Sequence, residues 1–248
     1  ATAATPAQTH QVFADAPCID TGLRHGTVTV PLDGLPLQIT TFRADGSYSD
    51  ARHPDTVRFS DSIFEDLARR DFTVNAMAYA PGRGLADPHG GAADIAARLL
   101  RCVGNPWLRF GEDALRILRA LRFAATLDFS IDPKTASALR ARRGLLSRIS
   151  AERKAEELCK LLRSARPGGV LYRYASVIAA CVPALEAACG DKDVWRRTTA
   201  WIDALPPELF VRLAALLSPL PPPAAQGAMA ALRLDNATRQ AAGQLLEN

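Results

Sequence analysis

The stretch Arg109-Phe-Gly-Glu-Asp-Ala-Leu-Arg-Ile-Leu-Arg-Ala-Leu-Arg-Phe-Ala-Ala125 organises the rest of this 248-residue sequence. Small and apolar residues recur along it at helical spacing: Ala114, Ile117, Leu118, Leu121 and Ala125. This pattern predicts an amphipathic helix with one face in a core. The other side carries a charge every three positions, at Asp113, Arg116, Arg119 and Arg122. On such a helix Asp113 and Arg116 are i,i+3 neighbours, so we expect an ion pair between them. Taken alone, this charged face is typical of a solvated helix surface.

Charge is distributed unevenly along the chain. The net charge is only +4, yet residues 98–166 hold 16 Lys and Arg against 7 Asp and Glu. A basic central third predicts a polyanionic ligand such as a nucleotide or RNA. The five cysteines are odd in number and show no CxxC spacing, which favours reduced thiols in a cytoplasm over disulfides or a zinc site. The apolar runs are short and interrupted by charge, so we expect no membrane span.

The predicted elements change in kind along the chain. Two β-rich segments, 25–30 and 37–42, are joined through Asp33-Gly34, which is a hairpin signal. The C-terminal half has a helical period almost throughout, with a capped helix start at Asp132-Pro133. This order predicts an α+β fold, with a mixed α/β portion followed by an all-α portion and a junction near residues 105–110.

A second charged segment, Arg69-Arg-Asp-Phe-Thr-Val-Asn-Ala-Met-Ala-Tyr79, holds two cations, a carboxylate and a carboxamide within seven residues. A helix that ends in arginine, followed by a half-buried strand, would account for it. The functional interpretation assigns Arg70 to a phosphate, and Asp71 and Asn75 to a sugar or to the loop itself. The polar loop 43–58 before this segment is long, and long loops are usually functional or mobile.

Three motifs taken together resemble the class II tRNA nucleotidyltransferases, the bacterial CCA-adding enzymes, with the bacterial poly(A) polymerases as close relatives. They are Arg69-Arg-Asp-Phe-Thr-Val-Asn-Ala76, Asp87-Pro-His-Gly-Gly-Ala-Ala-Asp94 and the central stretch Arg109–Ala125. Supporting matches are Gly22–Val30, Thr40–Tyr48 and Ile149–Arg153. The match follows the family's order and covers residues 1–165, which makes the resemblance specific.

The resemblance implies a three-part architecture. Residues 1–107 would be a partial nucleotidyltransferase head with a mixed sheet, 108–170 a helical neck that selects the nucleotide and binds RNA, and 171–248 a helical body. It also implies a cytoplasmic enzyme that adds CCA to tRNA 3′ ends without a template. Its substrates would be CTP and ATP, its cofactor Mg²⁺ and its partner tRNA.

By the same resemblance, Asp113 and Arg116 should read the incoming base. Cytosine and adenine both present an exocyclic amino donor beside a ring-nitrogen acceptor, and a carboxylate next to a guanidinium complements that pattern. The same pair faces the wrong groups on uracil and guanine, so we expect discrimination against them. The residues expected to contact the triphosphate are Arg70, Arg119 and Arg122. Those expected to support the site are Glu112, Asp71, Asn75 and Arg43.

The sequence departs from the family at its metal ligands. Members carry a Gly-Gly-x-x-Arg-Asp segment and then Asp-x-Asp-x-x-Thr, and Ala1-Thr2 matches only the end of the second motif. We therefore expect the Mg²⁺-binding aspartates upstream of Ala1, and this chain alone to be inactive, because phosphoryl transfer depends on metal. Gln38 stands where relatives often have an acidic residue, and Arg197 and Ser218 stand where some carry His or His-Asp ligands. We assign no second metal site.

Other functions remain open from the sequence. Within the family, the chain could come from a poly(A) polymerase or from an enzyme that adds only CC or only A. A rival of another class is a non-catalytic RNA-binding helical module. A third is a plain helical interaction domain, which would show no salt-dependent affinity for tRNA.

Overall fold

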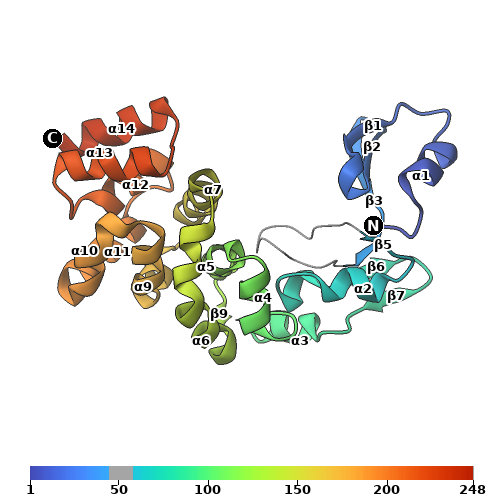
Figure 1. The fold of residues 1–248 in the computed structure, drawn as a ribbon, viewed down its shortest axis with the longest axis horizontal. Coiled ribbons are helices and arrows are strands. Elements are labelled where there is room, and N and C mark those ends of the chain that lie inside the picture. The colour runs from blue at the N-terminus through green and yellow to red at the C-terminus, as the bar shows by residue number, and fades with distance from the viewer. Residues whose placement is uncertain (45–57, 248) are drawn as a thin grey trace. The chain divides into compact units, whose positions relative to one another are not determined.

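The computed structural model describes residues 1–44 and 58–247, and the chain divides into two compact units, Ala1–Ala93 and Asp94–Asn248. Most strands belong to the first unit and most helices to the second, so the predicted α+β order is confirmed (Figure 1). The finer division into 1–107, 108–170 and 171–248 stays a prediction.

The first unit is built from short elements. In chain order they are α1 (Pro6–Val12), β1 (Ile19–Gly22), β2 (Thr27–Leu32), β3 (Leu35–Thr40), β4 (Arg43–Ala44), β5 (Arg58–Phe59), α2 (Ile63–Ala68), β6 (Ala78–Ala80) and β7 (Gly84–Ala86). Helix α3 (Gly91–Ala96) begins at the end of this unit and continues into the next. Single 3₁₀ turns occupy Leu23–His25 and Thr73–Asn75.

The predicted hairpin is confirmed. Strands β1, β2 and β3 form an antiparallel sheet in that order, and Leu32 pairs with Leu35 across the turn. Asp33 and Gly34 both have positive φ, 49° and 78°, which a two-residue turn of the I′ type requires. Val28 and Val30 of the central strand β2 are fully buried. Thr29 between them is 7% exposed, so both faces of this central strand are covered.

The polar loop predicted at 43–58 has paired ends. Arg43 lies opposite Phe59 and Ala44 opposite Arg58, so the two ends form the short antiparallel pair β4–β5. The rest of that loop, residues 45–57, lies outside the described residues.

The second unit is mainly helical. Its helices are α4 (Pro106–Glu112), α5 (Leu115–Leu127), α6 (Pro133–Arg142), α7 (Ala151–Leu162), α8 (Gly168–Arg173), α9 (Ala175–Cys181), α10 (Glu186–Gly190), α11 (Lys192–Ala204), α12 (Leu209–Leu217), α13 (Pro222–Ala231) and α14 (Asn236–Glu247). One short parallel pair joins β8 (Leu99–Leu100) to β9 (Ser130–Ile131), and β9 lies within the predicted all-α portion. Among the described residues, no helix combines the length and apolar character that crossing a membrane needs.

The single helix predicted through Arg109–Ala125 is wrong in one respect, because the chain breaks at Asp113. Helix α4 ends at Glu112, and Asp113 is extended at φ −141° and ψ 104°. Its carboxylate accepts the Leu115 backbone N–H at 3.0 Å and so competes with a helical path. Beyond the break, Ile117, Leu118 and Leu121 of α5 are buried, which confirms the predicted apolar face.

A buried arginine of α12 contacts the C-terminal ends of α7 and α11. Arg212 of α12 is 2% exposed. Its guanidinium donates hydrogen bonds to the carbonyl of Leu162, the last residue of α7, at 2.7 Å and to the carbonyl of Leu205, just after α11, at 3.0 Å. Carbonyls at helix ends lack intrahelical partners, so Arg212 satisfies groups from two helices at once.

Candidate functional site

Asp113 lies at the break between α4 and α5 and has partners from two elements. Besides the Leu115 N–H on Oδ1, its Oδ2 lies 3.1 Å from Nη2 of Arg153, in the first turn of α7. The two side chains are 18% and 24% exposed. A carboxylate has about four lone-pair sites, so these contacts orient Asp113 and still leave it acceptor capacity toward a ligand.

Arg116 is held by groups that precede it in the chain. Its Nη1 lies 2.7 Å from Oε2 of Glu112 and 3.1 Å from the carbonyl oxygen of Arg109. Glu112 also accepts from Arg109 Nη1 at 2.6 Å. The predicted Asp113–Arg116 ion pair is therefore wrong: the break takes Asp113 out of helical register, and Glu112, four residues before Arg116, pairs with it instead. Arg116 is also buried, at 9% exposure, and does not lie on a solvated face.

Arg119 and Arg122, both predicted to contact a triphosphate, meet a carboxylate from another helix. Glu157 of α7 is 4% exposed, and its Oε2 lies 2.6 Å from Arg122 Nε. Its Oε1 lies 3.9 Å from Arg119 Nη1, a longer ion pair. The Arg122 guanidinium also lies over the Phe123 ring, 4.0 Å from the centroid. Helix α7 thus holds both arginines in place through one buried group.

Sequence reasoning missed the two α7 residues that make these contacts. Arg153 and Glu157 lie one turn apart on α7 and reach Asp113 and Arg122, which are 40 and 35 residues away in the chain. The motif Ile149–Arg153 supported the resemblance without a role for its arginine. A matching i,i+4 pattern of opposite charges on α7 was the one signal that could have suggested these roles.

The remaining predicted residues belong to the first unit, where Arg70 and Arg43 contact Asp66 of α2, which is 1% exposed. Its carboxylate accepts from Arg70 Nη2 at 2.7 Å, from Arg69 Nη2 at 2.8 Å and from the backbone N–H of Arg43 at 3.1 Å. Burial raises the pKa of Asp66, but the hydrogen bonds and charges of Arg70 and Arg69 outweigh it and leave that pKa below its usual value. Asp66 therefore remains ionised and keeps both arginines in fixed positions.

Asp71 and Asn75 bond to each other. Asn75 Nδ2 donates to Asp71 Oδ1 at 2.7 Å, and the Phe72 backbone N–H lies 3.2 Å from an oxygen of each side chain. Of the two roles open to them from the sequence, the structure shows the contact with the loop itself.

The described residues do not form a magnesium site. Within 1–44 and 58–247, no three His, Cys, Asp or Glu side chains gather at metal-binding distance. Gln38 lies on β3 with an exposed side chain. Arg197 and Ser218 line one surface cavity of about 330 Å³ and bring no carboxylate or imidazole to it. No catalytic step through a metal is derived from these residues.

Comparison with known proteins finds sequence relatives over about two thirds of the chain. Residues 1–101 match the family model "Poly A polymerase head domain", and residues 128–173 match "Probable RNA and SrmB-binding site of polymerase A". The CCA-adding enzyme of Pediococcus pentosaceus is 44% identical over 167 residues, 67% of this chain and 42% of the relative. That of Bacillus licheniformis is 46% identical over 171 residues, 69% of this chain and 43% of the relative.

A solved structure agrees with these matches. The Bacillus stearothermophilus CCA-adding enzyme in complex with CTP superposes with a TM-score of 0.81 at 33% identity, over 99% of this chain and 59% of that one. The chain spans about two fifths of the length of the curated relatives it matches. The two family models, the sequence relatives and the structural match agree, and the chain belongs to the nucleotidyltransferase family of the CCA-adding enzymes and bacterial poly(A) polymerases.

Proposed function

We propose that this protein acts in the addition of CCA to the 3′ ends of tRNA, with CTP and ATP as substrates. The observation that carries the proposal is Asp113, a carboxylate at a helix break that Leu115 and Arg153 orient without using all its lone pairs. The similarity to CCA-adding enzymes, one of them solved with CTP, supports the nucleotide as its ligand. All five cysteines are free, which fits work in the reducing cytoplasm.

Base selection would depend on Asp113 and Arg116 together. Asp113 would accept the exocyclic amino group of cytosine or adenine, and Arg116 would donate to the ring nitrogen beside it. Glu112 and the Arg109 carbonyl orient the Arg116 guanidinium before any base arrives. A preorganised pair discriminates strongly, because uracil and guanine would leave its oriented polar groups without partners.

The triphosphate would meet arginines that are already oriented. Glu157 orients both Arg119 and Arg122, and their guanidinium groups are suited to two-point contact with phosphate. Arg70 would act in the same way in the first unit, where Arg69 and Arg70 share Asp66. Mg²⁺, which the family uses, would complete the site through ligands other than the described residues.

The test uses this chain joined to the Asp-x-Asp segment of a CCA-adding relative. Incorporation of each of the four nucleotides into a tRNA that lacks its CCA end should occur with CTP and ATP and not with UTP or GTP. Asp113→Ala should reduce that selection far more than it reduces tRNA affinity. Equal loss of both would contradict the base-reading role, and no incorporation by the joined protein would favour a non-catalytic RNA-binding module.

Poly(A) polymerase is the second candidate, because both family models carry the name of that enzyme. The same assay separates the two. Incorporation of ATP alone, without CTP, would favour poly(A) polymerase.

A further inference from the structure

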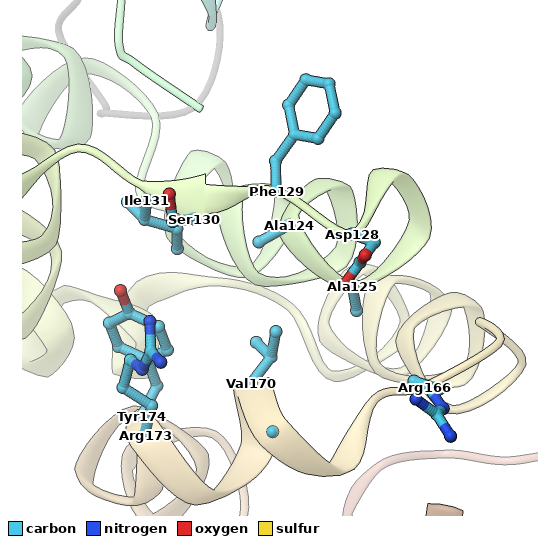
Figure 2. A pocket seen from close by; sticks show the side chains of 11 residues that line it. Ala124, Ala125, Asp128, Phe129, Ser130, Ile131, Arg166, Val170, Arg173 and Tyr174 are labelled. Atoms are coloured by element: carbon cyan, nitrogen blue, oxygen red, sulfur yellow. The ribbon is translucent and has the colours of Figure 1, made fainter. Parts of the chain in front are cut away.

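A pocket of about 260 Å³ lies in the second unit, between the C-terminal end of α5 and helix α8 (Figure 2). Its walls are small or apolar where Ala124, Ala125 and Val170 line it. Figure 2 shows Arg166 and Arg173 at opposite ends of the pocket, with Val170 between them. The pocket thus combines an apolar floor with a cation at each end.

The charge of the pocket favours an anion. Arg166 and Arg173 are exposed, and among the described residues neither has a carboxylate partner. One carboxylate, Asp128, lies on the rim, and Arg98 pairs with it at 3.2 Å. The C-terminal end of α5 adds a partial negative charge of about one half, which two full guanidinium charges outweigh. The net field at the pocket is positive.

The surrounding sequence is strongly basic. Residues 134–173 contain 11 Lys and Arg against 3 Asp and Glu. Both pocket arginines lie in the span, 128–173, that matches the family model named for RNA binding. Clustered arginines in such a span are typical of contact with a nucleic-acid backbone.

We propose that this pocket binds the sugar–phosphate backbone of the tRNA, with Arg166 and Arg173 donating to phosphate oxygens along one strand. The inference rests on the proposed function, because it takes tRNA as the substrate. The planar guanidinium suits two-point contact with a phosphate, and the apolar floor suits the ribose between phosphates. A Cβ added at Gly169 would meet nothing within 4 Å, so the backbone is open to a strand there.

The pocket is distinct from the base-reading position. Asp113 precedes α5 and Asp128 follows it, so the two lie at opposite ends of the helix, about 20 Å apart at 1.5 Å per residue. A nucleotide bound at Asp113 would not reach that far, whereas a tRNA would.

The charge test measures affinity of this 248-residue chain for a tRNA that lacks its CCA end, by fluorescence anisotropy at several salt concentrations. Arg166→Gln and Arg173→Gln should each weaken binding roughly fivefold. Each should also lower the slope of log affinity against log salt by about 0.7 to 0.9. Arg196→Gln, which removes an exposed arginine of α11 paired with Asp193, is the matched control and should change little.

A steric test keeps both arginines. Gly169→Leu places a side chain over the pocket and should weaken tRNA binding without lowering thermal stability, because leucine is the better helix former and its Cβ has open space there. Gly227→Leu, in α13 with equally open space, is the control and should leave tRNA binding unchanged. Binding of CTP alone should be unaffected by all five variants.

The outcomes separate the two proposals. If the Arg166, Arg173 and Gly169 variants bind tRNA like their controls, the pocket inference is wrong and tRNA as substrate still stands. If they weaken CTP binding and leave tRNA binding intact, the phosphate belongs to the nucleotide, and the inference is again wrong. If the unaltered chain shows no salt-dependent affinity for tRNA, tRNA binding by this chain is itself contradicted.

Discussion

The two units use contacts between carboxylates and arginines in different ways. In the first unit, Asp66 gathers Arg69 and Arg70, which are three and four residues away on the same helix end. In the second, Asp113 and Glu157 join α5 to α7, and their arginine partners lie 40 and 35 residues away in the chain. The first arrangement stabilises one local segment, whereas the second fixes the relative position of two helices. Loss of a carboxylate should therefore have local consequences in one unit and interhelical consequences in the other.

The largest expected effect is that of Asp66→Ala. It leaves Arg69, Arg70 and the Arg43 N–H without their shared acceptor, and we expect a loss of about 4 kcal/mol in the stability of the first unit. Hydrogen exchange should accelerate in α2. All three tryptophans lie in the second unit, so tryptophan fluorescence during denaturation should not change. A shift of that fluorescence transition would contradict a local role.

Acid should act on the same group. The folded pKa of Asp66 lies below its unfolded value of 3.8. Its contribution to the stability of the first unit is therefore fully present above pH 3.8 and is lost as the pH falls through the folded pKa. Hydrogen exchange of α2 followed below pH 4 should show this loss. In Asp66→Asn the hydrogen exchange of α2 should not show this dependence on acid.

Glu157→Ala should have the next largest effect. We expect it to lower the stability of the second unit by about 3 kcal/mol, because it leaves the nearly buried Arg122 without its 2.6 Å partner. This loss should appear in the tryptophan transition of the second unit under urea. Glu156→Ala is the matched control, since Glu156 is exposed and its ion pair with Lys160 lies along its own helix. Equal effects of the two substitutions would show that the contact between α5 and α7 does not depend on Glu157.

Arg153→Met should change the selection of nucleotides more than the stability of the second unit. The pair with Asp113 is partly exposed, so we expect a stability loss of only about 1 kcal/mol. In the joined enzyme described above, freeing Asp113 should lower discrimination between CTP and UTP roughly tenfold, which corresponds to about 1.4 kcal/mol. Arg153→Lys should restore part of it. Arg233→Met, which removes an exposed partner of Glu152, should alter neither property.

The smallest effects concern two glycines with equally open surroundings. Gly34→Ala should lower the stability of the first unit by about 1 kcal/mol, because φ is +78° in the hairpin turn. Gly227→Ala lies inside α13 and should raise the stability of the second unit by about 0.5 to 1 kcal/mol. Differential scanning calorimetry of both variants would measure this. If both substitutions changed stability in the same direction, backbone conformation would not decide the effect of replacing glycine with alanine.

Local signals in the sequence predicted local structure correctly. The Asp33-Gly34 turn formed as expected, and Asp132 accepts the Thr135 N–H at 3.0 Å and caps α6 as its Asp-Pro pattern predicted. Both depend on residues within three positions of each other, whose conformational preferences act before any tertiary contact forms.

The break at Asp113 and the contacts of α7 could not be predicted in the same way. The apolar period continues through Ala114, so periodicity alone indicates an unbroken helix, and one side-chain hydrogen bond to Leu115 decides otherwise. Arg153 and Glu157 reach Asp113 and Arg122 only after α5 and α7 have packed together. The spacing of residues along the chain does not show that these two helices will be neighbours. The base-reading roles of Asp113 and Arg116 stay predictions that depend on the resemblance and on hydrogen-bond complementarity.

Arg212 has a consequence for how the chain can be divided. Because one guanidinium donates to carbonyls at the ends of both α7 and α11, a fragment cut between these helices and α12 would leave those carbonyls without this donor. Arginine keeps its proton at every physiological pH, so this junction should hold under conditions that would release a lysine or histidine. A piece of the chain that keeps both contacts must therefore include Arg212 of α12.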